Sequence, residues 1–258
     1  MSVHIIVCVK SVVKVAPRGV TRRTPDNSEL NPFDRPALEA ALRVRQASGG
    51  TVTALSMGPD VGAEALAEAQ AMGVDKAVLI NDRALAESDT LVTSQVLAAA
   101  IKKIGAYDLL FFGTRTADSD TGQVGPQTAA AVDIPFVSGV KAIESRDGEW
   151  QMLRTIDGWE ERWQVRLPAA ATIDPRAFAP RPVGLVGISQ AFERPAITQW
   201  SLNELELSPE QVGLAGSPTR VAALQKIKHD RSCEMLSGEP GEQVDQLMQR
   251  LTNAGLIG

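Results

Sequence analysis

The side chains with the clearest chemical potential lie in one segment, Asp118 to Ala129. It follows a predicted buried strand at 108–112 and runs directly into an alanine-rich helix. A short loop of Asp, Thr and Gly between a strand and a helix suits phosphate binding, because the first helical turn has unpaired N–H groups and a dipole that favours negative charge. Thr121 can cap this helix or bind a phosphate oxygen, and Gly122 and Gly125 let the backbone approach closely.

The segment by itself is equally compatible with an ordinary capped helix start. It contains neither a Walker lysine pattern nor G-x-G-x-x-G. Asp118 and Asp120 could form a carboxylate pair for acid–base or Mg²⁺ chemistry, but beside a phosphate we expect them to orient loop N–H groups or a ribose hydroxyl. With only His4 and His229 in the chain, a histidine metal site or a catalytic triad is not expected. We therefore predict no catalytic residue and no metal.

The composition is that of a globular domain. The 258 residues are 44% apolar and 22% charged, which is ordinary for a soluble protein. The net charge is −5 with scattered Lys and Arg, so nucleic-acid binding is not expected. No apolar run approaches the roughly 20 residues that span a bilayer, so membrane insertion is not expected. Two cysteines make no disulfide framework, and the N-terminus leads straight into a strand, so we predict a cytoplasmic protein.

The elements that must position the loop alternate along the first half of the chain. Apolar runs of strand length alternate with amphipathic helical segments, a pattern that predicts a three-layer α/β fold with a mostly parallel sheet. Asn31 is expected to cap the first helix, with Pro32 at its first position and Asp34 in its first turn. Residues 11–30 are interpreted as a long irregular excursion. Strands are predicted at 4–9, 51–57, 76–80 and 108–112, and further helices at 63–72 and from Ser88 or Asp89 to Lys103.

Beyond Pro135 the pattern changes to short alternating segments with Asp-Gly turns. We interpret these segments as antiparallel strands added to the edge of the parallel sheet. Residues 175–195 carry four prolines and are expected to form an exposed loop. Residues 196–258 are expected to form an extended arm, with one helix at 243–251, that packs on a partner or on the main domain. The added strands are predicted at 136–145, 150–156, 161–167 and 169–173.

Asp118 to Ala129 resembles the nucleotide-binding loop of the beta subunit of electron transfer flavoproteins, where the pattern D-x-D-x-x-Q-x-G recurs. Four other segments follow in the order found in that family, and the resemblance extends from about Val3 to the last glycine. Each segment is a weak signal alone, but the five together in order are a strong one. The four are Val7-Cys8-Val9-Lys10, Asn31-Pro32-Phe33-Asp34, Ser56-Met57-Gly58-Pro59 and Gly216-Ser217-Pro218-Thr219-Arg220-Val221.

The resemblance implies a Rossmann-like fold of the adenine nucleotide hydrolase-like type. It implies a heterodimer with an alpha subunit that holds most of the FAD, and AMP or a second FAD in this chain. Electrons would pass from a flavin-dependent dehydrogenase to a quinone reductase or similar acceptor. The alternative is a stand-alone adenine-nucleotide-binding domain, either a universal-stress-like sensor or a nucleotide hydrolase. The implied domains are 1–174 for nucleotide binding, 175–195 for partner recognition and 196–258 as the arm on the partner subunit.

The resemblance also assigns residues. Val15 and Phe33 would face the flavin, although Phe33 is equally suited to anchor the start of its helix. Cys8 is expected to be a small core residue and Met57 a packing residue, so that any nucleotide contact comes from the backbone. The implied cofactor-binding set is Cys8, Asn31, Pro32, Phe33, Asp34, Met57, Asp118, Asp120, Thr121, Gly122, Gln123, Val124, Gly125, Thr128 and Ala129.

Residues 175–195 resemble the recognition loop that the family presents to dehydrogenases. Leu185 aligns with the exposed leucine of that loop, and Leu185, Val186 and Ile188 are the predicted docking residues. The loop departs from the lysine-rich form of the family, which predicts weaker steering to an acidic docking site and a different set of donors. The departures are Gln190, Phe192 and Glu193.

Overall fold

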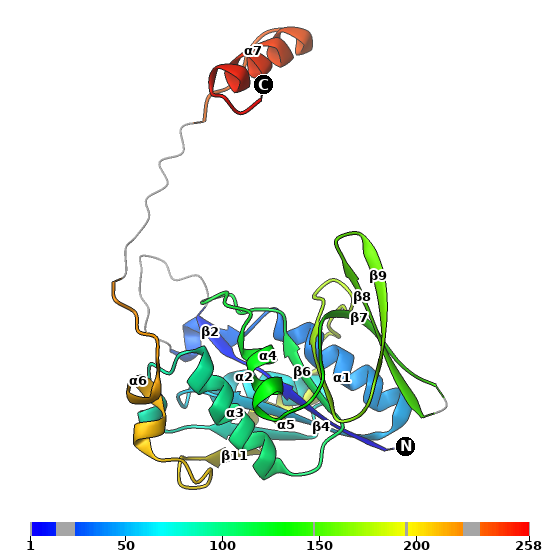
Figure 1. The fold of residues 1–258 in the computed structure, drawn as a ribbon, viewed down its shortest axis with the longest axis vertical. Helices are drawn as coiled ribbons and strands as arrows, with labels where there is room; N and C mark the ends of the chain where they lie inside the picture. The colour runs from blue at the N-terminus through cyan, green and yellow to red at the C-terminus, as the bar shows by residue number, and fades with distance from the viewer. Residues whose placement is uncertain (1, 14–23, 147, 194–195, 224–232, 258) are drawn as a thin grey trace. The chain divides into compact units, whose positions relative to one another are not determined.

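The computed structural model describes residues 2–13, 24–146, 148–193, 196–223 and 233–257. It divides into two units, Met1–Arg220 and Val221–Gly258. The first unit is built on a nine-stranded sheet with the order β11-β5-β4-β1-β6-β10-β7-β8-β9 (Figure 1). The strands are β1 (Val3–Cys8), β4 (Gly50–Met57), β5 (Lys76–Ile80), β6 (Leu109–Gly113), β7 (Phe136–Arg146), β8 (Glu149–Ile156), β9 (Trp159–Val165), β10 (Ala169–Ile173) and β11 (Ile197–Trp200).

Neighbouring strands are parallel from β11 to β7, and only β7–β8 and β8–β9 pair antiparallel. The central strands are apolar on both faces: Ile5, Ile6 and Val7 of β1 are all fully buried. Such runs are typical of parallel strands covered on both sides. Each fully buried Leu, Ile or Val contributes roughly 1.5–3 kcal/mol, so these strands are a major source of stability.

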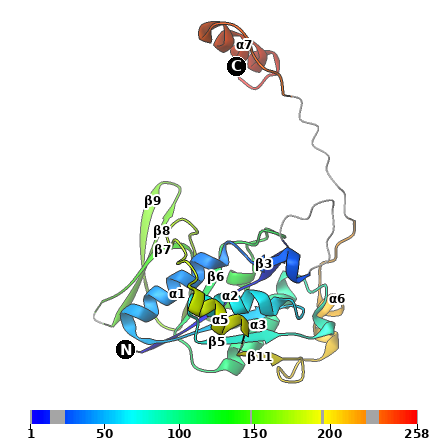
Figure 2. The same cartoon turned by 180° about the vertical axis from the view of Figure 1, so that it is seen from behind.

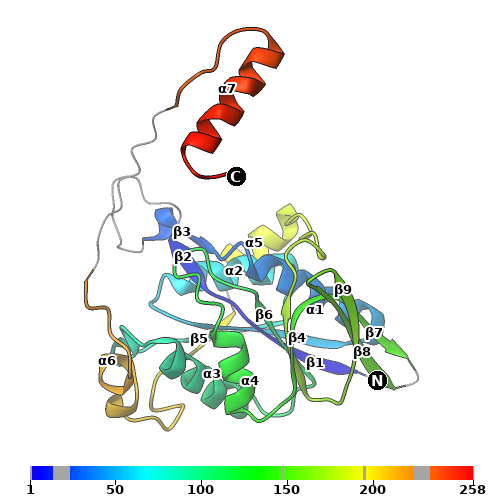
Figure 3. The same cartoon turned by 45° about the horizontal axis from the view of Figure 1, so that its top comes forward.

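Helices cover both faces of the sheet. The helices α1 (Asp34–Ser48), α2 (Gly62–Met72) and α5 (Leu185–Glu193) lie on one face (Figure 2), and α3 (Thr90–Ile104) and α4 (Val124–Ala131) lie on the other (Figure 3). Two separate apolar clusters fill the two sheet–helix interfaces, one packed with α1 and α2 and the other with α3 and α4. The predicted three-layer α/β fold is therefore confirmed.

The cap of α3 is resolved in favour of Asp89. Its Oδ1 accepts a hydrogen bond from Val92 N at 3.0 Å, and its Oδ2 accepts from Thr219 N and Oγ1 at 3.1 and 2.7 Å. Burial would raise the pKa of Asp89, but the hydrogen bonds from Val92 and Thr219 outweigh it and lower the pKa. Thr219, in one of the segments singled out from the sequence, is thus bonded to the N-cap of α3.

Residues 11–30 are not wholly irregular. Two short strands, β2 (Ser11–Val13) and β3 (Ser28–Leu30), pair antiparallel as a separate two-stranded sheet. Val12 and Leu30 are fully buried, and the burial of these apolar side chains stabilises the pair of strands. Residues 14–23, between the two strands, lie outside the described part of the chain.

The interpretation of all four segments after Pro135 as antiparallel edge strands is wrong in part. β10 is an interior strand that pairs parallel with β6 and with β7. All five of its residues are buried, because its short alanine side chains are covered on both faces of the sheet. Only β8 and β9 are antiparallel additions, joined at the predicted Asp157-Gly158 turn.

The last third is also more regular than expected. Within the predicted loop 175–195 the chain forms α5, and within the predicted arm β11 pairs with β5 at the edge of the sheet. The predicted helix at 243–251 lies within α7 (Pro240–Asn253) in the second unit. No helix among the described residues is long and apolar enough to cross a membrane. The remaining short elements are η2 (Pro25–Asn27), η3 (Arg83–Leu85), η4 (Pro209–Gln211) and α6 (Gly213–Gly216).

Candidate functional site

The candidate site lies where the direction of strand order reverses. β1 pairs with β4 on one side and β6 on the other, and the helices that follow β1 and β6 cover opposite faces of the sheet. In open α/β sheets such a switch point, at the carboxyl ends of the strands, is where ligands bind. Cys8, Met57 and Gly113 end β1, β4 and β6, so the structure brings the segments at these three strand ends to one edge.

Lys10 links three parts of the site. Its Nζ lies 2.8 Å from Asp118 Oδ1, in the loop that follows β6. Its backbone N donates to Asp34 Oδ2 at 2.8 Å, and its carbonyl accepts from Asn31 N at 2.9 Å. The end of β1, the turn before α1 and the 114–123 loop are therefore held together by one residue. Lys10 was noted as part of a motif but was not among the predicted contacts, since nothing local indicates what its side chain reaches.

Asn31 does not cap α1, contrary to the prediction. The helix begins at Asp34 after Phe33, and its start has no side-chain cap. The fully buried Asn31 side chain instead donates from Nδ2 to Arg115 O at 2.9 Å and accepts at Oδ1 from Ala117 N at 3.2 Å. Asn31 thus satisfies one carbonyl and one N–H of the loop after β6, which fixes the path of that loop.

Asp34 is a buried carboxyl at the centre of this arrangement. Burial raises its pKa to about 7, although hydrogen bonds from Lys10 N, the Asn31 side chain and Gly113 N oppose the shift. A Cβ at Gly113 would lie 2.3 Å from Asp34 Oδ1, so glycine is required there. Burial, with a smaller contribution from Asp34, raises the pKa of the Cys8 thiol, which agrees with the expected role of Cys8 as a core residue.

A second cation, Arg115, lies at the open side of the loop. Its guanidinium carbon is 4.5 Å from the centroid of the half-buried Phe33 ring, and its Nη1 is 3.4 and 3.5 Å from the two oxygens of Asp120. The side chains of Arg115 and Asp120 are 52% and 62% exposed, so solvent reaches both. Sequence analysis missed Arg115, although a cation just ahead of a predicted phosphate loop was an available signal.

The loop leads into α4 without a side-chain cap. The N-cap is Gln123, whose side chain makes no cap hydrogen bond, so Thr121 does not cap this helix. Gly122 has φ of +62°, in the left-handed region that favours glycine. Thr121, Gly122 and Gln123 are exposed, and Asp118 keeps a side chain that is 23% exposed. This stretch is the part of the predicted segment that a ligand can reach.

The rest of the segment packs α4 on the sheet. A Cβ at Gly125 would lie 3.2 Å from Thr172 Cγ2 and 3.3 Å from Phe112 Cγ, so this glycine serves close helix–strand packing. Thr128 is fully buried and donates from Oγ1 to Val124 O at 2.7 Å, and Ala129 is buried in the α3–α4 cluster. Val124 and Met57 are half-buried against the same cluster, as expected for Met57.

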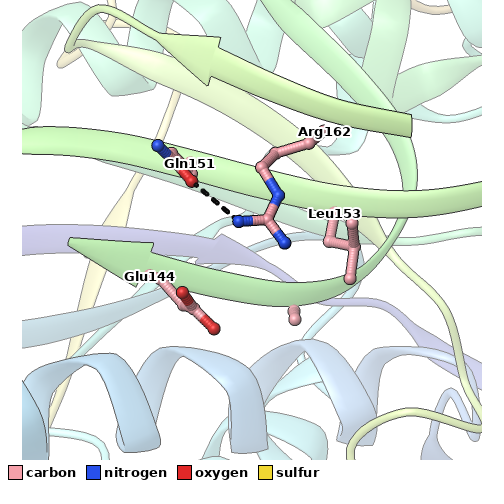
Figure 4. Close-up of a pocket in the computed structure, with 5 residues that line it drawn as sticks. Glu144, Gln151, Leu153 and Arg162 are labelled. Carbon is pink, nitrogen blue, oxygen red and sulfur yellow. Dashed lines mark hydrogen bonds between the residues drawn. The ribbon is translucent and has the colours of Figure 1, made fainter. Parts of the chain in front are cut away.

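A separate pocket lies on the antiparallel extension of the sheet (Figure 4). Arg162 Nη1 donates to Gln151 Oε1 at 3.5 Å across two of its strands. None of the predicted site residues belongs to this pocket. Its lining consists of Ala142, Glu144, Gln151, Leu153 and Arg162.

Comparison with known proteins gives one family. The electron transfer flavoprotein domain matches residues 19–205. The chain is 38% identical over 230 residues to the electron transfer flavoprotein subunit beta of Thermoanaerobacterium thermosaccharolyticum, covering 89% of this chain and 88% of the relative. It is 40% identical over 262 residues to the caffeyl-CoA reductase-Etf complex subunit CarD of Acetobacterium woodii, covering 98% and 100%. Protein FixA of Azorhizobium caulinodans is 35% identical over 232 residues, covering 84% and 82%.

This chain belongs to the electron transfer flavoprotein family. The resemblance to the beta subunits is confirmed by relatives of that name that match over most of the chain. Membership implies flavin-associated electron transfer and an alpha-subunit partner. The individual cofactor-binding residues stay predictions, and Val15 lies outside the described residues.

The predicted docking residues of this flavoprotein subunit lie on α5, outside the 114–123 loop. Leu185 is 86% exposed, Val186 71% and Ile188 41%. The helix packs on α2 through its opposite side, where Ala191 is buried. The three apolar side chains are thus held at the surface, while their docking role stays a prediction.

Proposed function

We propose that this chain is the beta subunit of a heterodimeric electron transfer flavoprotein that binds AMP or a second FAD and completes the FAD site of its alpha subunit. It would act in the cytoplasm and shuttle electrons from a flavin-dependent dehydrogenase to a quinone reductase or similar acceptor. One observation supports nucleotide binding. Lys10 and Asn31 hold the 114–123 loop in place, and the exposed end of that loop leads directly into α4, whose start has no side-chain cap.

The side chains at this edge fit a phosphate-bearing ligand. Lys10, just after β1, and Arg115, in the 114–123 loop, are cations at this edge, and each is paired with a loop aspartate that a phosphate can replace. The N-terminal turn of α4 adds N–H groups that no side chain of the N-cap satisfies. Asp118 and Asp120 would then orient the loop or bind a ribose hydroxyl. AMP and FAD share an adenosine monophosphate part, so the choice between them depends on whether the site also holds the second phosphate and the flavin part of FAD.

The flavin supplies the redox chemistry when bound, and this chain supplies binding and orientation. Phe33 is half-buried at the site edge with Arg115 on its ring, a rigid apolar surface suited to face an isoalloxazine ring. No residue of this chain is proposed to make or break bonds. Because several relatives are named as subunits, they favour the heterodimer over a stand-alone nucleotide-binding sensor or hydrolase.

The test is to co-express the chain with its alpha subunit, purify the heterodimer, release bound ligands with acid and quantify them by mass. One FAD and one AMP per heterodimer supports the AMP form of the proposal. Two FAD and no AMP supports the second-FAD form. A chain that captures neither an alpha subunit nor flavin, but binds AMP or ATP alone, refutes the proposal in favour of the stand-alone domain.

A further inference from the structure

Glu39, in the middle of α1, is a buried carboxylate that the nucleotide site does not use. It is 4% exposed, and two arginines surround it. Arg43 Nε and Arg181 Nε each donate to it at 2.7 Å, and Arg181 N donates at 3.2 Å. Burial alone would raise the pKa of Glu39, but the hydrogen bonds from Arg181 and Arg43 outweigh it and lower the pKa. Glu39 is therefore ionised at neutral pH and firmly bonded.

Arg181 lies in the segment that leads into α5, so this ion pair ties that segment to α1. Arg43 reinforces the tie, because its Nη2 donates to Ala179 O at 3.4 Å and its guanidinium lies 5.8 Å from the Phe178 ring. Phe178 itself is buried in the apolar cluster packed with α1. The entry to α5 is thus anchored by both charge and packing.

The helix α5 has a second anchor on α2. A Cβ at Gly187 would lie 2.5 Å from Ala71 O, so the two helices approach at a residue without a side chain. Just past the helix, Gln70 Nε2 donates to Ala196 O at 3.2 Å. These contacts hold one side of α5 against the fold and leave Leu185 and Val186 exposed.

A helix of nine residues is too short to be stable by itself, since isolated helices below roughly 12–15 residues are marginal in water. Its direction depends on these two anchors. We propose that Glu39, acting through Arg181, is a positioning residue for donor docking: it fixes the direction in which α5 presents Leu185 and Val186 to a flavin-dependent dehydrogenase. This inference rests on the proposed function of α5 as the docking element.

A preorganised docking helix binds more tightly because less ordering occurs on association. Loss of the ion pair frees the segment before α5 without altering the apolar side chains that meet the partner. We expect the KM for the donor to rise about tenfold, which is the effect of losing one hydrogen bond to a charged group, and kcat to change little. The flavin and nucleotide contents are expected to stay at wild-type levels.

The test uses the heterodimer and the variants Glu39→Gln and Arg181→Gln. The probe is the flavin-dependent dehydrogenase of the same organism that reduces the wild-type heterodimer fastest. Amide hydrogen exchange over 185–193 reports the mobility of α5 separately from electron transfer. Arg176→Gln is the matched control, since it removes a positive charge from the same segment at a side chain that is 89% exposed. Gly187→Ala disturbs the second anchor without changing charge.

We expect faster exchange in α5 and a raised KM for Glu39→Gln and Arg181→Gln at both low and high salt, and neither effect for Arg176→Gln. Partial recovery in Arg181→Lys, which keeps the charge but not the paired geometry, supports the same role. Wild-type exchange in both Glu39→Gln and Arg181→Gln overturns the inference. The inference is also overturned if Glu39→Gln and Arg181→Gln show faster exchange in α5 but a wild-type KM, while Leu185→Ala raises KM. If Leu185→Ala also leaves KM unchanged, the docking function of α5 itself is refuted, and the exchange data still decide whether the ion pair holds α5.

Discussion

Replacement of the buried Asp34 by asparagine is expected to remove a pH dependence from the stability of this protein. The folded carboxyl keeps its proton up to about pH 7, because burial raises its pKa. In the unfolded chain it ionises near its ordinary pKa of about 3.9. Between these values the folded state binds more protons than the unfolded state, so stability falls as pH rises. The contribution is complete below about pH 4 and lost above about pH 7.

The magnitude follows from the shift. A rise from 3.8 to about 7 corresponds to about 4 kcal/mol at about 1.4 kcal/mol per pKa unit. About 3 kcal/mol of this falls between about pH 5 and pH 8, a range in which the heterodimer can be handled. The amide introduced by Asp34→Asn would keep the shape of the side chain and one acceptor for the N–H groups of Lys10 and Gly113, and it does not titrate. The free energy of unfolding of the variant is therefore expected to lack this change of about 3 kcal/mol between about pH 5 and pH 8 that the wild type shows.

The assay is urea unfolding of the heterodimer at fixed protein concentration from about pH 5 to pH 8, with wild type and Asp34→Asn in parallel. Asp26→Asn is the control, because that aspartate is exposed and its replacement is expected to leave the wild-type pH profile. The difference between the wild-type and Asp34→Asn curves is expected to change by about 3 kcal/mol across the range. Parallel curves would refute the reasoning, because they would mean that Asp34 is already ionised in the folded protein at the acidic end of the range.

Three other predictions concern the proposed functional surfaces. Asn31→Ala removes two buried hydrogen bonds to the loop and is expected to cost about 1–3 kcal/mol in urea unfolding and to lower nucleotide content; wild-type values for both would contradict its role. Arg115→Gln is expected to weaken nucleotide retention about tenfold in ligand release on dilution, and Arg115→Lys less so; equal retention in all three proteins would exclude a phosphate contact. Leu185→Ala is expected to slow donor-supported electron transfer in stopped-flow experiments with normal FAD content; loss of FAD or of assembly would instead mark α5 as structural.

The helix α1 connects the two surfaces that these predictions address. Phe33 and Asp34 at its start belong to the proposed nucleotide site, and Glu39 in its middle bonds to Arg181 in the segment that leads into α5, the proposed docking helix. The effects of mutations on the two surfaces can be measured separately. The tests of Asp34 and Asn31 measure stability and nucleotide content, whereas those of Glu39 measure amide exchange in α5 and KM for the donor.

The order of elements in the first half of the chain followed from the sequence alone. Buried parallel strands such as β1 and β5 are mostly apolar runs, and α3 is preceded by the N-cap Asp89 and followed by the C-cap Gly105, so these elements depend on local patterns. The loop from Asp118 to Gln123 was likewise visible, because a strand, a polar turn and a helix lie consecutively in the chain. The family followed from five short segments in the right order.

Only the tertiary structure decided how the distant residues combine. Asparagine is a residue type that favours helix N-caps, yet the Asn31 side chain forms hydrogen bonds to loop residues 84 and 86 positions away. These tertiary contacts outweigh the local preference for capping. β10 was grouped with the short strands that follow Pro135, but its place between β6 and β7 depends on which strand edges are left unpaired. Lys10, Arg115 and Glu39 gain their roles from how the chain folds around them. Local patterns set which segments are helices and strands, whereas pairing of buried polar groups across the fold sets which of their side chains form a site.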